Sequence, residues 1–88
     1  GSNVAIAHRV YLATGNHDYT DHTMSYRNAP IHIEDGVWIA SCSFIGPGVT
    51  LGTHCVIGAG SVVTKSVASW TVNRGNPAQV IGLRKLIK

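Results

Sequence analysis

The sequence predicts an all-β fold, a parallel β-helix built from a six-residue repeat, and three observations lead to this prediction. Large aliphatic residues recur six positions apart without a break, at Ile33, Ile39, Ile45, Leu51, Ile57 and Val63. The position after the aliphatic residue is small in four of these repeats, at Ala40, Gly46, Gly52 and Gly58. The position four after it holds small or β-branched residues, namely Val37, Ser43, Val49, Cys55, Ser61 and Val67.

A period of six matches neither the 3.6-residue turn of a helix nor the simple alternation of a strand. It matches a short strand followed by a turn, so that three strands close a triangular coil and coils then stack in parallel register. Residues 33–50 are expected to form one coil and residues 51–68 the next. The aliphatic residue points into the triangle, and the small residue after it is expected to let the backbone turn the corner.

The repeat also begins earlier in the chain and is interrupted once. Ile6 and Leu12 restart the aliphatic pattern, but Leu12 and Ile33 are twenty-one residues apart, which is three more than a multiple of six. The segment between them is polar and contains no repeat. We therefore expect coils over residues 3–16 and 33–68, with an insertion over about residues 17–31 that protrudes as a loop.

After Val67 the six-residue pattern stops, which leaves a C-terminal tail of residues 69–88. The spacing of Val80, Ile81 and Leu83 favours a short C-terminal helix in this tail. The 88 residues are read as a single domain, and because a solenoid needs caps at its ends, we interpret it as the C-terminal part of a longer protein.

The composition points to contacts with further copies of the chain. Only 12% of the residues are charged, so the outer faces are weakly polar and an oligomer is expected. The net charge is +3, with the basic residues concentrated near the C-terminus, but no recognition motif accompanies them and nucleic acid is not a predicted partner. No membrane span or targeting sequence is evident, so no membrane partner is predicted and a cytoplasmic location is expected. Cys42 and Cys55 lack the spacing of a metal site, and no metal is predicted.

Several segments of the chain resemble the hexapeptide-repeat O-acetyltransferases. They read IEDGVWIA at residues 33–40, IGPGVTLG at 45–52, IGAGSVVTK at 57–65 and GNPA at 75–78. With ATGNHDY at residues 13–19, the resemblance is closest to sugar acetyltransferases of the colanic-acid and the maltose or galactoside type. It implies a left-handed coil, a homotrimer with acetyl-CoA in a groove between subunits, and direct transfer of acetyl to a hydroxyl of a sugar-like acceptor.

The resemblance also implies a catalytic base at His17. An acceptor hydroxyl is a poor nucleophile until its proton is removed, and a positioned histidine contributes roughly 10²–10⁴-fold in this role. Asn16 matches a position that helps to hold the acceptor, although it could equally be a turn residue. Asp18 could orient the imidazole, but adjacent side chains often point apart.

Cofactor binding maps by the same resemblance onto Trp38, Ser41, Ala59, Thr64 and Lys65, and we add Ala40 and Arg84 on chemical grounds, which makes seven candidate residues. Small residues leave room for the pantetheine arm, Trp38 offers a flat apolar wall, and a backbone N–H near Ser41 could stabilise an oxyanion. Lys65 and Arg84 would meet phosphate groups. The chain departs from the family where an arginine often follows the GNPA motif, because Gln79 stands there, and Arg84 or Lys85 could serve instead.

Two other functions stay open. Some carbonic anhydrases share this fold and bind zinc between subunits, and His17 and His22 could supply two ligands. A zinc enzyme typically needs three protein ligands, and His54 would be the third if packing brings it near. The chain could also be a non-catalytic β-helical fragment or a trimeric binding module, because the N-terminal coils that supply part of the acceptor site in the family are absent.

Overall fold

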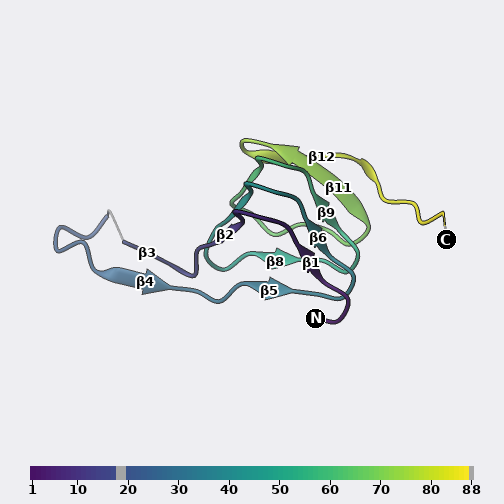
Figure 1. Ribbon diagram of the computed structural model, residues 1–88. Helices are drawn as coiled ribbons and strands as arrows, with labels where there is room; N and C mark the ends of the chain where they lie inside the picture. Colours follow the sequence, from purple (N-terminus) through teal and green to yellow (C-terminus); the bar gives the residue numbers. More distant parts are fainter. Residues whose placement is uncertain (18–19, 88) are drawn as a thin grey trace.

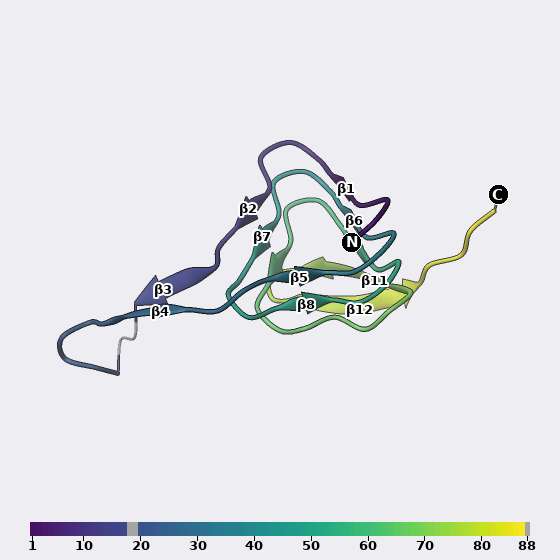
Figure 2. The same ribbon diagram turned by 90° about the horizontal axis from the view of Figure 1, so that it is seen from below.

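A computed structural model describes residues 1–17 and 20–87, and in these residues the chain consists of short strands joined by turns. The strands are β1 (Ala5–Ile6), β2 (Tyr11–Leu12), β3 (Gly15–His17), β4 (Tyr26–Asn28), β5 (His32–Ile33), β6 (Trp38–Ile39), β7 (Phe44–Ile45), β8 (Thr50–Leu51), β9 (Val56–Ile57), β10 (Val62–Val63), β11 (Thr71–Gly75) and β12 (Ala78–Leu83). Most of them wind into a triangular coil (Figure 1), which Figure 2 shows end-on. The predicted all-β class is confirmed. None of the described segments is a helix long and apolar enough to cross a membrane.

The coil has three faces, and on each face successive coils pair as parallel strands. The first face holds β1, β6, β9 and β11, the second β2, β7 and β10, and the third β5 and β8. Between the later coils the paired residues are eighteen positions apart, as in Trp38 with Val56, Phe44 with Val62, and His32 with Thr50. This register confirms the coil that the six-residue spacing predicts.

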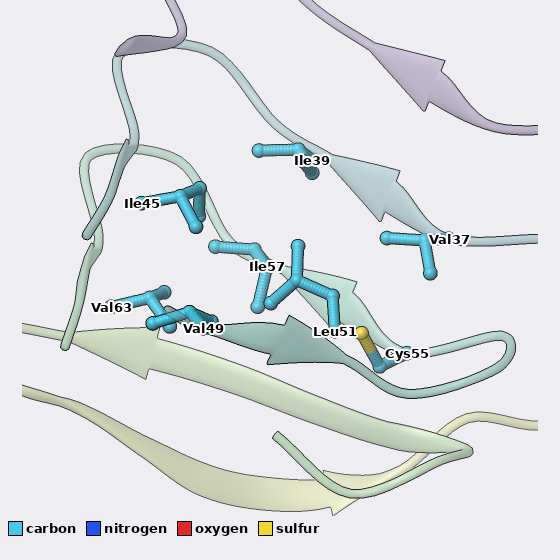
Figure 3. Packing of buried hydrophobic residues seen from close by; sticks show 8 residues of the cluster. All are labelled: Val37, Ile39, Ile45, Val49, Leu51, Cys55, Ile57 and Val63. Carbon is cyan, nitrogen blue, oxygen red and sulfur yellow. The ribbon is translucent and has the colours of Figure 1, made fainter. Parts of the chain in front are cut away.

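The core is a set of inward columns that run along the axis of the coil. Its fully buried members are residues of the predicted inward positions, labelled in Figure 3: Val37, Ile39, Ile45, Val49, Leu51, Cys55, Ile57 and Val63. Burying one aliphatic side chain of this size contributes about 1.5–3 kcal/mol, so each column holds its coils together through apolar contact. Burial also raises the pKa of the Cys55 thiol to about 11, which agrees with a core residue and not a reactive one.

The backbone turns each corner in a left-handed conformation that recurs every six residues. Positive φ values occur at Gly36, Cys42, Gly48, His54 and Gly60, between 59° and 74°. The left-handed conformation therefore does not occur at the predicted turning points, which are the small residues at positions 40, 46, 52 and 58. At Gly52 a side chain is excluded because the next coil passes close by: a Cβ there would stand 2.5 Å from the Ser69 nitrogen.

The last coil is two residues shorter than the others. Val72 pairs with Val56, and Leu51 bridges to Val67, so each pair is sixteen positions apart. Val67 therefore pairs with Leu51, a residue of the large aliphatic position. The six-residue spacing had assigned Val67 to the small or β-branched position, and that assignment was wrong. The shortening falls between Val63 and Val67, in the turn that carries two of the predicted cofactor residues.

The predicted C-terminal helix was wrong over the segment that carries its apolar spacing. Residues Ala78–Leu83 form β12, which runs antiparallel to β11 after a turn at Asn76 and Pro77. Three apolar residues within four positions are too few to distinguish the spacing of a helix from that of a strand. The exposed edge of β11 offers unpaired backbone groups, and β12 satisfies them.

The insertion is a β-hairpin that projects from the coil (Figures 1 and 2). Strands β3 and β4 pair antiparallel, with His17 opposite Tyr26, and the Ala29 N–H donates to the Thr14 carbonyl at 2.7 Å to close the base. Around the hairpin the paired residues Ala5 and Trp38 are thirty-three positions apart, fifteen more than in the later coils. Strands β1 and β6 thus pair in the same way as the strands of the later coils, although the hairpin lies between them in the sequence.

The close approach at Gly52 leads to a stability prediction. Gly52→Ala is expected to lower the free energy of unfolding by about 1–3 kcal/mol, because the added Cβ would also stand 2.8 Å from the Val67 carbonyl oxygen and the backbone must shift. Gly82→Ala is the matched control, since nothing lies within 4 Å of its Cβ. Urea unfolding followed by circular dichroism measures both, and equal losses in the two variants would contradict the packing argument.

Candidate active site

His17 ends strand β3, and its ring contacts Met24 and Tyr26 within the hairpin. Nδ1 lies 2.8 Å from the Met24 carbonyl oxygen. A carbonyl oxygen can only accept, so Nδ1 must carry the proton in this hydrogen bond. In the neutral ring the lone pair then belongs to Nε2, which is the atom that can accept a proton. The second contact is with Tyr26, whose ring meets that of His17 edge to face at a centroid distance of 5.2 Å.

Met24 and Tyr26 are functional candidates that the sequence does not reveal. Both lie in the polar insertion, where no periodic pattern predicts which residues will face one another. Only the antiparallel pairing of β3 with β4 brings Tyr26 opposite His17, and only the hairpin turn brings the Met24 carbonyl back to the imidazole. A short-range hairpin signal such as Asn-Gly could have found the pairing, but the insertion contains none.

The two predicted neighbours of His17 are described only in part. Asn16 precedes it in β3, where its backbone pairs with that of Arg27, and its side chain is outside the described structure. Asp18 lies outside the described residues. The assignment of Asn16 to acceptor binding therefore stays a prediction.

Trp38 and Arg84 lie at one groove on the outside of the first face. The groove is lined by outward residues of three successive strands and by the C-terminal segment: Trp38, Val56, Val72, Leu83, Arg84, Lys85, Leu86 and Ile87. Trp38 is 47% exposed, so part of its ring is available as an apolar wall. Arg84 is half-buried, and its Nη1 donates to the Gly36 carbonyl at 2.7 Å and to the His54 carbonyl at 3.1 Å.

The other predicted cofactor residues lie at two further places. Ser41 and Ala59 occupy stacked turns after the first face, where the Gly60 N–H donates to the Ser41 carbonyl at 2.9 Å; Ala40 begins the turn that follows β6. Thr64 and Lys65 line a hollow together with Pro77, Ala78 and Gln79. The structure thus brings Gln79 next to Lys65, and it does not gather the seven cofactor residues into one pocket of a single chain.

The histidines of the zinc hypothesis do not converge on one point of the fold. His17 and His22 belong to the hairpin, whereas His54 lies in a corner of the coil and stacks on Trp70 at a centroid distance of 4.3 Å. Among residues 1–17 and 20–87, no group of three or more His, Cys, Asp or Glu side chains is arranged to hold a metal ion.

Comparison with known proteins agrees with this architecture. Residues 30–65 match the family model of the bacterial transferase hexapeptide (six repeats). The chain is a hexapeptide-repeat protein. The matched segment runs from the base of the hairpin through the fully regular coil, which is where the eighteen-residue register holds.

Relatives of this hexapeptide-repeat chain include named acetyltransferases. The galactoside O-acetyltransferase of Escherichia coli (strain K12) is 43% identical over an alignment of 86 positions, which covers 92% of this chain and 41% of that protein. WcaF of the same organism, which bears the provisional name of a colanic acid biosynthesis acetyltransferase, is 42% identical over 81 residues, 92% of this chain and 44% of that protein.

A solved structure superimposes closely on the chain. A hexapeptide-repeat acetyltransferase of Vibrio cholerae O1 biovar eltor, complexed with acetyl-CoA, has a TM-score of 0.90 at 33% identity and covers 98% of this chain and 49% of its own. The chain thus spans less than half the length of the relatives that it matches.

The contacts of Arg84 lead to a prediction about its role. Arg84→Ala is expected to lower the free energy of unfolding by about 1.5–3 kcal/mol, because a charged group loses its hydrogen bonds to two corner carbonyls. Lys85→Ala is the control, as an exposed cation on the same segment, and is expected to change stability by less than about 0.5 kcal/mol. Thermal unfolding measures both. Similar values for the two variants would show that Arg84 does not brace the corner.

Proposed function

We propose that the chain is part of an acetyl-CoA-dependent O-acetyltransferase that acetylates a hydroxyl of a sugar or similar acceptor, with His17 as the general base. The observation that carries the proposal is the hydrogen bond from His17 Nδ1 to the Met24 carbonyl, since it assigns the basic lone pair to Nε2. The relationship to named acetyltransferases supports the reaction class.

The proposed mechanism assigns two proton transfers to His17. Acetyl-CoA supplies the acetyl group as a thioester and leaves as the free thiol. As the acceptor oxygen attacks, Nε2 takes the hydroxyl proton while Nδ1–H stays bonded to the Met24 carbonyl, so that the ring carries a positive charge next to a hydrogen-bond acceptor. The same Nε2 proton then protonates the departing sulfur, which returns His17 to its neutral form. A backbone N–H near Ser41 would stabilise the oxyanion.

The surface chemistry of the coil supports the further proposal of a left-handed homotrimer with acetyl-CoA bound between subunits. Outward residues of the first face are apolar at Trp38, Val56 and Val72, and those of the second face include a stacked pair, Tyr11 on Phe44, with ring centroids 5.7 Å apart. Two adjacent apolar faces on so small a chain are suited to contact with further copies. Trp38 with Arg84, and Thr64 with Lys65, would then each contribute to one composite groove.

Binding of the acetyl donor is the first test. Titration of acetyl-CoA into the purified chain by calorimetry, with light scattering for the mass, is expected to give about one site per subunit of a trimer. Absence of binding at millimolar acetyl-CoA would sink the proposal for this chain and favour the non-catalytic module. Zinc would then be titrated to test the carbonic-anhydrase alternative.

Removal of the base is the second test. His17→Ala is expected to lower kcat by about 10²–10⁴-fold with acetyl-CoA binding unchanged, because the variant loses proton transfer and keeps the outer groove. His22→Ala is the matched control, since it removes a second histidine of the same hairpin that has no role in the mechanism. Steady-state kinetics with a panel of sugars measures both variants. Full activity of His17→Ala would reject His17 as the base.

A further inference from the structure

We infer that Asp21 is a positioning residue, which fixes the hairpin turn so that the Met24 carbonyl meets His17 Nδ1 and holds the imidazole in its basic tautomer. This inference rests on the proposed function of His17. Asp21 would act on His17 through the backbone of the turn that it organises.

The Asp21 carboxylate spans the turn with both of its oxygens. Oδ1 accepts the Thr23 N–H at 3.0 Å, and Oδ2 accepts the Ser25 hydroxyl at 2.7 Å. The Asp21 carbonyl accepts the Met24 N–H at 2.8 Å. Asp21 therefore accepts three hydrogen bonds, from Met24 itself and from the residues on both sides of it. The hydrogen bonds that the carboxylate accepts, first from Ser25 and then from Thr23, lower the pKa of the Asp21 carboxyl below its usual value. The carboxylate form, which accepts these bonds, therefore prevails at neutral pH.

Met24 needs this support because its backbone is held in an unfavourable conformation. Its φ of 53° lies in the left-handed region, which a side chain such as that of methionine rarely adopts. Half of the Met24 side chain is exposed, so little packing holds it in place. The carboxylate bonds on either side are what the described structure offers to keep the Met24 carbonyl turned toward His17, 2.8 Å from Nδ1.

The contact with Tyr26 cannot replace this bond. Tyr26 meets the imidazole edge to face, at an interplanar angle of 89°, which limits where the ring lies. An aromatic edge or face does not select between the two nitrogens as the Met24 carbonyl does. Without the carbonyl, the proton can occupy Nε2, and in that tautomer the lone pair lies on Nδ1, so Nε2 can no longer accept the hydroxyl proton.

The test compares Asp21→Ala with Asp21→Asn and uses Asp35→Ala as the charge-matched control. Asp35 is likewise an aspartate that accepts a backbone N–H, from Ser2, but it lies away from the hairpin. The first readout is the His17 tautomer, from side-chain ¹⁵N chemical shifts of the whole chain. The second is kcat and KM for acetyl-CoA. Dispersion of the amide spectrum checks that each variant is folded.

We expect the Nδ1–H tautomer of His17 in the unaltered chain and in Asp35→Ala, and a mixture of tautomers in Asp21→Ala. We expect kcat of Asp21→Ala to fall about tenfold or more with the KM for acetyl-CoA unchanged. Asp21→Asn should recover part of the loss, because its carbonyl oxygen can still accept the Thr23 N–H.

An unchanged His17 tautomer in folded Asp21→Ala would overturn the inference, whatever the activity. An inactive unaltered chain would count against the proposed function alone, because the tautomer still decides the role of Asp21. Equal losses of kcat in Asp21→Ala and Asp35→Ala would also overturn the inference, since the effect would then be one of charge.

Discussion

The structure depends on a turn that must be made in a left-handed backbone conformation once in every six residues. Glycine takes this conformation readily, and Gly36, Gly48 and Gly60 hold alternate corners. Cys42 and His54 hold the corners between them, where a side chain costs about 1–2 kcal/mol. The corners close because each one stacks on the next: the Gly60 N–H, for example, donates to the Ser41 carbonyl. Only residues that keep this spacing stay in the inward columns.

The corner at His54 shows how the chain supports such a strained residue. The imidazole stacks on Trp70 with an interplanar angle of 2°, and Gly36 leaves room on the other side, since a Cβ there would stand 2.6 Å from the ring. An aromatic pair of this kind contributes about 0.5–1.5 kcal/mol beyond its buried area. Arg84 then links three coils, because its Nη1 bonds to the carbonyls of two corner residues and its N–H to that of the third, Trp70. The C-terminal segment is therefore part of the stability of the coil.

The sequence predicts the repeating part of this protein well and the departures from it poorly, for a physical reason. Ile39, Leu51 and Ile57 are buried because an inward position returns every six residues, so their spacing is enough to predict the core and the coil. The C-terminal helix was wrong because the path of residues 78–83 depends on the free edge of β11, which local spacing does not encode. Likewise, His17 could be placed by resemblance, but its partners Met24 and Tyr26 depend on the register of a hairpin without a repeat.

The candidate base lies where the repeat breaks, and the geometry suggests why the candidate site is divided. The hairpin leaves the coil at the corner after the second face, and the C-terminal segment leaves it near the corner before the first, so the chain extends 52 Å in its longest direction and about 24 Å in the others (Figure 2). His17 and the groove of Trp38 therefore lie on different sides of one chain. A hairpin that reaches beyond its own coil can meet the face of a neighbouring copy. In the proposed trimer, the docking of two coils would set the distance between the proposed base and the groove.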